Sequence, residues 1–242
     1  MIYCDIHTHQ PGQYQEDIAV ISVDIRKPFA LRILQDNPEN KPEIALIQKQ
    51  ATEKIEYYAA GVHPWYIDNI HADIANDLFA KVRKYARLPE IAAIGETGLD
   101  KITATTENDF ILQQELFLSH AHLSEKVKKP LIIHCVKAWD ELLRIRKSIK
   151  PSMPWIIHGF RGKKTLATQL LNAGLFLSFG IHHNTGALQM AWIKHRLLVE
   201  TDDKNIDIRD VYKLIAKDLN IPESKLSEDI AFFFNTRILT SG

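Results

Sequence analysis

Short runs of aliphatic and β-branched residues alternate along the chain with longer stretches in which apolar residues recur at helical spacing. The runs that we expect to be strands are Ile2–Ile6, Ala19–Val23, Glu56–Gly61, Glu90–Gly95, Pro130–Cys135, Pro154–His158, Leu175–Ser178 and Arg196–Glu200. The stretches that we expect to be helices are Lys41–Lys54, Ala72–Ala86, Glu107–Val127, Trp139–Ser148, Lys163–Ala173, Ala187–Ile193, Ile208–Leu219 and Pro222–Leu239. Eight strands alternating with helices in 242 residues predict an α/β fold, a (β/α)₈ barrel of the TIM type.

The pattern is least regular in the first third of the expected barrel. Only residues 10–18 separate the first two strands, whereas a parallel crossover usually takes a dozen residues or more. We therefore expect no helix there, and we expect Ala19–Phe29 to form a hairpin or an edge piece. No repeat, low-complexity tract or linker interrupts the chain, so we expect residues 1–242 to form a single domain.

The charge balance narrows the classes of partner. The chain has 30 Lys and Arg residues against 30 Asp and Glu residues, and its formal net charge is zero with 11 histidines counted as neutral. This balance argues against a protein that holds long nucleic acid by its overall field. Two cysteines, no signal sequence and no bilayer-spanning segment predict a cytoplasmic protein, with no membrane association and no obligate protein partner evident.

The most distinctive local pattern is Asp5-Ile-His7-Thr-His9, directly after the first apolar run. Alternate residues of a strand share a face, so Asp5, His7 and His9 would point inward together at the carboxyl end of this strand. Two imidazoles placed in this way can reach one metal ion, with Asp5 free to orient one of them. A pair of surface-loop histidines is the alternative interpretation.

Polar residues end four further expected strands. They are Glu96 in Gly95-Glu-Thr-Gly-Leu-Asp100, His134 in Leu131-Ile-Ile-His, His158 in Trp155-Ile-Ile-His-Gly and Asp202 after Leu197-Leu-Val-Glu-Thr201. A single histidine at the end of a buried strand is usually a hydrogen-bonded core residue. Six candidates at the ends of five strands instead favour one site at the carboxyl-terminal face, where barrel enzymes build their active sites.

These candidates offer nitrogen and oxygen ligands. Such a set suits zinc or manganese, or magnesium where carboxylate and water dominate. Four histidines and two carboxylates exceed what one tetrahedral ion with an open position needs, so two ions sharing a bridging carboxylate fit better. Paired ions stabilise the attacking and leaving oxygens of a displacement and lower the pKa of bound water. The expected reaction is hydrolysis of an ester, phosphoester or amide.

Other histidines and aromatic residues also have structural interpretations. His120 and His122 lie two apart in an expected helix, a spacing that puts them on different faces, and we interpret both as structural. Trp65, Phe160 and Trp139 flank the candidate site motifs and could stack on a base or sugar ring. Packing at the rim of the barrel is the alternative, and it is favoured for Trp139.

Six short motifs stand in the order seen in the TatD family of metal-dependent hydrolases, which the sequence resembles. They are His7-Thr-His9, Gly61-Val-His-Pro64, Gly95-Glu-Thr-Gly-Leu-Asp100, Ile132-Ile-His134, Ile157-His-Gly-Phe160 and Glu200-Thr-Asp202. The resemblance runs from Asp5 to Asp202 and also touches Asn235-Thr-Arg237. The family belongs to the amidohydrolase-like barrel superfamily. The resemblance implies a (β/α)₈ barrel with two or three divalent ions that hydrolyses phosphodiesters, usually as a deoxyribonuclease.

The resemblance also implies roles for the matched residues. The implied metal ligands are His7, His9, Glu96, His134, His158 and Asp202. The two histidines of the first motif would hold one ion, the two later histidines a second, and Glu96 would bridge them. Asp202 would bind the first ion and accept the proton of the nucleophilic water, so Asp202 and Glu96 are the candidate catalytic residues.

Two further residues are candidates for substrate binding. The resemblance implies that His63 lines the pocket, where it would contact a phosphate or order a loop. Alternatively, His63 only caps its strand through its neighbour Pro64. Lys137 could meet a phosphate as a point charge, although it lacks the two parallel hydrogen bonds that arginine offers.

Three departures separate the chain from the usual family pattern. After the residue matching Asp202, the family usually continues with a proline-containing segment that helps to form the substrate side. This chain has Asp203-Lys-Asn-Ile-Asp207 instead and passes almost directly into a helix. Val136 stands where the family commonly has an arginine, and the first helix is missing.

The sequence therefore favours a TatD-like deoxyribonuclease or phosphodiesterase that uses Mg, Mn or Zn ions and a metal-activated water. Because the net charge is zero, the ions themselves would supply the binding charge, which favours DNA ends or short oligonucleotides over long duplex. One alternative is hydrolysis of another small phosphoester or amide by the same centre. Another is a metal-stabilised barrel without catalysis, which the ligands of an open site disfavour.

Overall fold

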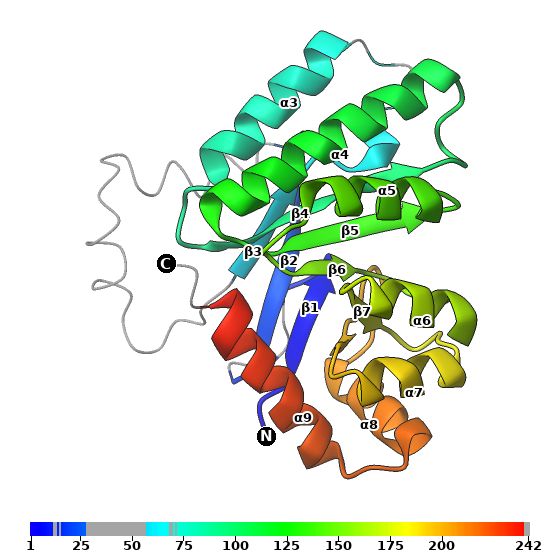
Figure 1. Ribbon diagram of the computed structural model, residues 1–242. Coiled ribbons are helices and arrows are strands. Elements are labelled where there is room, and N and C mark those ends of the chain that lie inside the picture. The colour runs from blue at the N-terminus through cyan, green and yellow to red at the C-terminus, as the bar shows by residue number, and fades with distance from the viewer. Residues whose placement is uncertain (12–13, 15, 28–56, 68–69, 71, 240–242) are drawn as a thin grey trace, which may run out of the picture.

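A computed structural model describes residues 1–11, 14, 16–27, 57–67, 70 and 72–239 of the chain (Figure 1). Eight parallel strands form one sheet in chain order. They are β1 Cys4–Thr8, β2 Ile18–Asp24, β3 Tyr57–Gly61, β4 Ile91–Asp100, β5 Leu131–Val136, β6 Trp155–Ile157, β7 Phe176–Phe179 and β8 Leu197–Val199.

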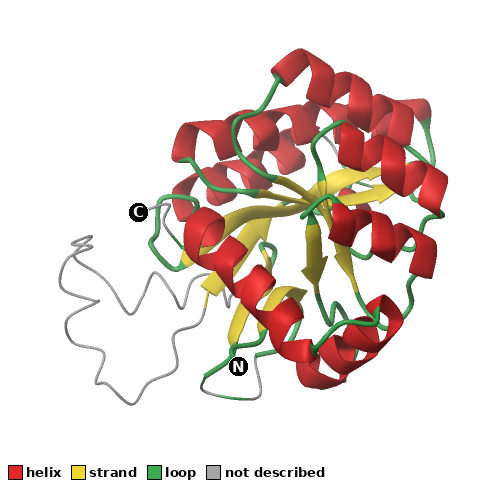
Figure 2. Cartoon of the chain, turned by 60° about the horizontal axis from the view of Figure 1, so that its bottom comes forward, coloured by secondary structure: helices red, strands yellow, loops and turns green. Residues whose placement is uncertain are grey.

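The two ends of this sheet meet at the carboxyl ends of β1 and β8. Thr8 forms an isolated parallel bridge with Asp202. The Asp202 amide donates to the His7 carbonyl at 3.0 Å, and the His9 amide donates to the Asp202 carbonyl at 3.1 Å. Strands lie in the middle of the molecule with helices around them (Figure 2). The predicted (β/α)₈ barrel is confirmed.

Helices follow most strands and cover the outside of the barrel. They are α3 Ala72–Tyr85, α4 Glu107–Val127, α5 Trp139–Ile149, α6 Lys164–Asn172, α7 Thr185–Ile193, α8 Ile208–Leu219 and α9 Glu223–Phe233, with a 3₁₀ turn η1 at Pro64–Tyr66. The longest of them, α4, begins with a capping box in which the Thr106 hydroxyl accepts from the Asp109 amide and the Asp109 carboxylate accepts from the Thr106 amide. None of the described helices is both long and apolar enough to cross a membrane.

The expectation that Ala19–Phe29 forms a hairpin or edge piece is wrong. β2 is a regular parallel strand between β1 and β3. Nine residues, 9–17, connect β1 to β2. An extended chain of that length reaches about 30 Å, and a five-residue strand is about 17 Å long, so the chain can return without a helix. Consistent with the expected missing helix, the described residues of this connection contain none.

Two elements differ from their expected bounds by more than two residues. β4 extends to Asp100, so Glu96 lies within this strand rather than after it. The register with β5 shifts between Ile94 and Thr97, which adapts the longer strand to the barrel. The single helix expected at Pro222–Leu239 is α9 followed by a π-helical turn at Phe234–Ile238. The helix expected at Lys41–Lys54 lies outside the described residues.

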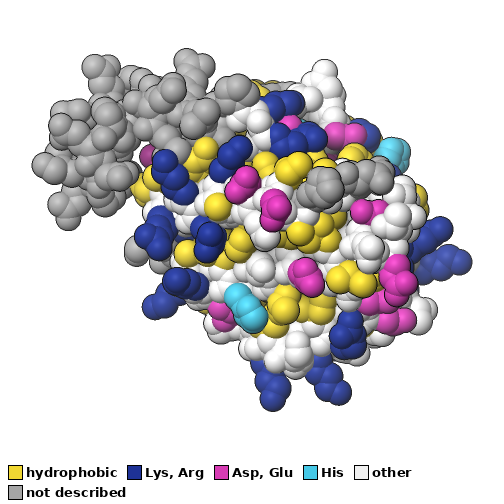
Figure 3. Space-filling model, turned by 90° about the horizontal axis from the view of Figure 1, so that it is seen from above, with side chains coloured by type: hydrophobic (Ala, Val, Ile, Leu, Met, Phe, Trp, Pro, Cys, Tyr) yellow, Lys and Arg dark blue, Asp and Glu magenta, His cyan; other side chains and the backbone are white. Residues whose placement is uncertain are grey.

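The core consists of the aliphatic residues of the strands and the inward faces of the helices. Cys4 and Cys135 belong to this core as free thiols, and burial raises the pKa of Cys4 to about 12. Outside, the face seen in Figure 3 carries both basic and acidic side chains, which agrees with the zero net charge.

His120 connects α4 to the end of β3. Its Nε2 accepts a hydrogen bond from the Val62 amide at 3.1 Å, so Nδ1 carries the ring proton and donates to the Leu116 carbonyl at 2.7 Å. The side chain is fully buried, and burial lowers the pKa of His120 to about 4. His120 is therefore a neutral structural histidine, whereas His122 is exposed on the same helix.

We expect His120 to make the fold sensitive to acid. Below about pH 6.5 the unfolded chain protonates this histidine, while the folded chain does so only near pH 4. The free energy of unfolding should therefore fall by about 3 kcal/mol between these two values. Urea unfolding across this range should give a flatter profile for His120→Gln than for the natural chain. His122→Gln is the matched control, and equal profiles for both variants would contradict the assignment.

Candidate metal centre

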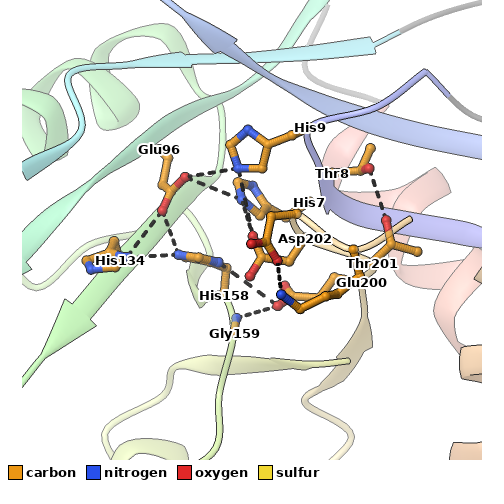
Figure 4. A network of polar contacts seen from close by, with 12 residues as sticks. His7, Thr8, His9, Glu96, His134, His158, Gly159, Glu200, Thr201 and Asp202 are labelled. Atoms are coloured by element: carbon orange, nitrogen blue, oxygen red, sulfur yellow. Dashed lines mark hydrogen bonds and ion pairs between the residues drawn. The ribbon is translucent and has the colours of Figure 1, made fainter. Parts of the chain in front are cut away.

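Glu96 lies among histidines at the carboxyl ends of the strands (Figure 4). Its Oε1 is 2.7 Å from His158 Nε2, 2.8 Å from His63 Nε2 and 3.3 Å from His134 Nδ1. The His134 and His158 rings also approach each other, with Nδ1 and Nε2 3.2 Å apart. Glu96 is 5% exposed, so imidazoles take the place of water around this oxygen.

The other oxygen of Glu96 faces the histidines of β1. Its Oε2 is 3.3 Å from His7 Nε2 and 3.8 Å from His9 Nε2. Asp202 Oδ1 approaches the same two nitrogens, at 3.6 and 3.7 Å. His7 and His9 thus share a face, as the strand periodicity predicted. The His7 nitrogens are fully buried, and neither makes a well-aligned hydrogen bond to a described residue. A buried nitrogen aimed at two carboxylates without such a bond fits a position for a cation.

Three groups of residues in this cluster could hold a metal ion. They are His7, His9 and Glu96; His7, His158 and Asp202; and His63, Glu96 and His134. Within each group the ligand atoms lie within 4.8 Å of one another. All six expected metal ligands thus meet at one place, and His63 joins them. His63 also caps η1, because its Nδ1 accepts from the Trp65 amide at 3.1 Å. Pocket lining and capping are therefore compatible at this residue.

The charged groups of the cluster shift one another's pKa values. Burial lowers the pKa of His7, but the nearby carboxylates of Glu96 and Asp202 outweigh burial and raise it well above its usual value. Burial raises the pKa of Glu96, but His158 and His7 outweigh it and hold that pKa well below the usual range. Burial likewise opposes the shift of Asp202, whose pKa falls to about 2 beside His7. Both carboxylates are therefore ionised at neutral pH.

Two glycines explain how β4 brings Glu96 so close to its neighbours. Gly95 has a φ of 135°, and a Cβ there would lie 2.5 Å from the Ile132 carbonyl oxygen of β5. Gly98 has a φ of 154°, and a Cβ there would overlap the His134 carbonyl oxygen. The Gly-Glu-Thr-Gly sequence thus lets β4 and β5 approach while Glu96 points into the site.

Asp100 is a site residue that the sequence reasoning missed. Its Oδ2 lies 3.1 Å from His134 Nε2 and accepts from Trp65 Nε1 at 2.9 Å. The contact fixes the ring so that His134 Nδ1 faces Glu96. Burial lowers the pKa of His134, but the carboxylates of Asp100 and Glu96 outweigh burial and raise this pKa to about 9. The available signal was a carboxylate at the end of the Gly95–Asp100 motif.

Glu200 is a second missed residue. It is 1% exposed, it accepts from the Gly159 amide, and its Oε1 lies 4.0 Å from His158 Nδ1. Glu200 thereby connects the end of β8 to the residues after β6. The signal for it was a charged residue directly after the apolar run Leu197–Val199.

Asp5 does not orient a histidine ring, so that expectation is wrong. Its Oδ1 accepts from the backbone amides of His7 and Thr201, each at 3.2 Å, and its Oδ2 accepts from the Thr201 hydroxyl at 2.6 Å. Backbone amides lie nearer than the rings because β1 and the chain after β8 converge here. Asp5 therefore holds these two segments together beneath the cluster.

All residues of the cluster except the fully buried His7 line a cavity of about 1530 Å³. Lys137 and Trp65 also line it; Lys137 is exposed and Trp65 is 59% exposed. Phe160 is 2% exposed and packs against Trp139, so both aromatic residues belong to the rim packing. Trp65 alone of these three aromatic residues leaves most of its surface exposed.

The short connection after Asp202 is present as the sequence indicated. α8 begins at Ile208, and the Asp207 side chain caps it by accepting from the Arg209 amide at 2.9 Å. Asp203 and Lys204 line the cavity. This side of the cavity is therefore formed by a short turn rather than by a longer segment.

Comparison with known proteins identifies the family. Residues 4–227 match the family model described as TatD related DNase. This match covers most of the chain and includes every residue of the cluster, so the chain belongs to the TatD family.

Several curated relatives carry names of metal-dependent hydrolases. A protein of Buchnera aphidicola named as an uncharacterized metal-dependent hydrolase is 30% identical over 156 residues, which cover 60% of this chain and 58% of the relative. The metal-dependent hydrolase YabD of Bacillus subtilis is 28% identical over 82% of this chain and 78% of the relative. The 3′-5′ ssDNA/RNA exonuclease TatD of Pantoea ananatis is 30% identical over 56% of this chain and 51% of the relative. The chain thus spans less than two thirds of several relatives that it matches.

Solved structures show the same fold. YjjV, a TatD homologue of Escherichia coli, superposes with a TM-score of 0.75 at 16% identity over 98% of this chain and 97% of that one. A TatD family hydrolase of Entamoeba histolytica gives a TM-score of 0.71 at 16% identity over 98% of each chain. At this identity the likeness concerns the barrel alone.

We expect divalent ions to stabilise the fold through this cluster. An ion at a hundredfold excess over its Kd adds about 2.7 kcal/mol to the free energy of unfolding, which raises Tm by about 5–10 °C for a chain of this size. Thermal melts with Mn²⁺ or Zn²⁺, and with EDTA, measure this shift. Glu96→Ala should abolish it, whereas the exposed Glu228→Ala on α9 should retain it. An equal shift in both variants would place the ion elsewhere.

Proposed function

We propose that the chain is a metal-dependent deoxyribonuclease, a phosphodiesterase that acts on DNA ends or short oligonucleotides. The observation that carries this proposal is the convergence of four histidines and Asp202 on the buried Glu96, beside a cavity of about 1530 Å³. The name of the Pantoea ananatis relative, an exonuclease on ssDNA and RNA, supports the same reaction class.

The donor set fits two divalent ions, Mg, Mn or Zn. The β1 histidines with Asp202 would hold one ion, His134 and His158 would hold the other, and Glu96 would contact both. His63, with Glu96 and His134, offers a group for a third ion. Bound ions would supply positive charge to the substrate phosphate and make a water more acidic.

Asp202 would accept a proton from the attacking water. Its pKa of about 2 keeps the carboxylate ionised at neutral pH. Its backbone is held on both sides, by the His7 carbonyl and by the His9 amide. The backbone of Asp202 is therefore already ordered beside the cluster, and substrate binding does not have to restrict it further. It would take the proton while the water oxygen attacks phosphorus and the nucleoside oxygen leaves.

Other residues would position the substrate. Lys137 would attract a phosphate as a point charge. His63, between Glu96 and Trp65, would contact the phosphate being cut. Trp65 is exposed while its Nε1 is anchored on Asp100, so its ring is a fixed surface on which a base can stack.

We expect nucleotide release from single-stranded DNA with added Mg²⁺ or Mn²⁺. Asp202→Asn should lower the rate by about 10²–10⁴-fold because it removes the proton acceptor. Glu96→Ala should lower it at least as much because it removes the shared ligand. Glu228→Ala, purified in parallel, controls for contaminating nucleases and should cleave normally.

The same assay separates the alternatives. The nuclease proposal would be contradicted if the natural chain showed no metal-stimulated cleavage of DNA. It would also be contradicted if Glu96→Ala cleaved DNA as fast as the natural chain. A parallel panel of small phosphoesters and amides then identifies another substrate of the same centre. Metal stabilisation without turnover on any of these substrates would indicate a barrel that keeps its ions for stability.

A further inference from the structure

Five cationic side chains line the cavity beside the metal centre. They are Arg26, Lys27, Lys137, Arg161 and Lys204. Their value for binding an anion depends on whether a neighbouring carboxylate already neutralises them, because a paired cation must give up its partner before it meets a substrate phosphate.

Three of the five are already paired. Asp24 accepts from the Arg26 guanidinium at 2.9 and 3.0 Å and lies 3.6 Å from the Lys27 ammonium. Lys204 forms an ion pair with Asp203 at 2.6 Å. Each of these three cations therefore already has a carboxylate partner, although Arg26 and Lys27 share Asp24.

Lys137 and Arg161 differ from the other three. Both side chains are exposed, and within the described part of the chain no carboxylate forms an ion pair with either. Each stands three residues after a histidine of the cluster, in His134-Cys-Val-Lys137 and His158-Gly-Phe-Arg161. β5 and β6 are adjacent, with Ile133 beside Ile157, so the two cations follow neighbouring strands at equivalent positions.

The backbone that leads to Arg161 is fixed by β7 and by the residue after β8. The Gly159 amide donates to the Glu200 carboxylate, and the Phe160 amide donates to the Ser178 carbonyl at 3.0 Å. The Phe160 ring is buried against Phe179, with ring centroids 5.8 Å apart. Arg161 therefore extends from an ordered loop while its guanidinium stays free for a ligand.

We propose that Arg161, assisted by Lys137, binds a second phosphate of the substrate, next to the phosphodiester at the metal centre. The inference rests on the proposed function, which puts the phosphodiester being cut at Glu96. A guanidinium offers two parallel N–H groups to a phosphate, and the ammonium adds a point charge. The site thus selects substrates in which another phosphate, terminal or internal, lies one nucleotide from the cut.

Binding of small oligonucleotides tests this selection without cleavage. The probes are dTpdT, with one phosphodiester; pdTpdT and dTpdTp, with an added terminal phosphate; and dTpdTpdT, with a second internal phosphate. Calorimetry with Ca²⁺ in place of Mn²⁺, on probes that chromatography shows to be intact afterwards, should give at least one of the other three probes an affinity about tenfold above that of dTpdT. This is the scale of a charge-assisted hydrogen bond. The probe that gains identifies a terminal or an internal phosphate.

Arg161→Ala should abolish this gain and leave the affinity for dTpdT unchanged. Arg161→Lys should keep part of the gain because it keeps the charge and loses the paired bonds. Arg87→Ala is the matched control, since Arg87 is an exposed arginine before β4, at the opposite end of the strands. The salt dependence of binding should also weaken in Arg161→Ala, by about 0.7 in the slope of log K against log salt.

The outcomes separate this inference from the proposed function. Equal affinity of the natural chain for all four probes, or a gain that survives Arg161→Ala, would overturn the second-phosphate site. With Mn²⁺ present, Arg161→Ala should lower kcat/KM about tenfold for the probe that binds more tightly than dTpdT. The kcat/KM for bis(p-nitrophenyl) phosphate, which has a single phosphate, should be unchanged. Absence of cleavage by the natural chain would contradict the nuclease function, while the binding comparison still decides the role of Arg161.

Discussion

The buried carboxylate of Glu96 is the constraint around which the functional end of the barrel is organised. A carboxylate removed from water destabilises a fold unless charged or hydrogen-bonding partners replace the lost solvent. Glu96 meets this requirement with imidazoles from β1 and β5 and from the residues that follow β3 and β6. Segments far apart in sequence must therefore be in place together before this charge is accommodated.

The barrel closes where β1 meets the chain after β8, and the same residues that close it there also form part of the site. This junction is called the seam below. The hydrogen bonds that join β1 to the chain after β8 involve His7, His9 and Asp202 through their backbone atoms, while their side chains enter the cluster. Asp5 and Thr201 reinforce the seam from below. A change that opens the seam would consequently disturb ligand geometry even if no ligand were replaced.

Periodicity located much of this site because strands have a simple rule. Alternation put His7 and His9 on one face, and parallel strands bring their carboxyl ends to one end of the barrel, which is why Glu96, His134, His158 and Asp202 could be grouped without coordinates. Long amphipathic stretches likewise located the helices from α3 onward.

The errors have physical causes as well. A parallel return needs chain length rather than a helix, so spacing could not exclude β2 as a barrel strand. Asp5 bonds to backbone groups that come near only when the barrel closes. Asp100 and Glu200 act through contacts with residues more than thirty positions away. No local pattern records such partners, whereas the glycine-flanked position of Glu96 was visible because its constraint is local.

That glycine pair has a consequence for how such a barrel can diverge. Glu96 is a side chain, and a single codon change can replace it while leaving the path of β4 intact. Gly95 and Gly98 are different, because any Cβ would collide with backbone atoms of β5. Descendants that lost the chemistry could therefore vary the acid between the glycines before they varied the glycines. In the Gly-Glu-Thr-Gly sequence, the glutamate therefore reports the chemistry and the glycines report the fold, and the two can change at different rates.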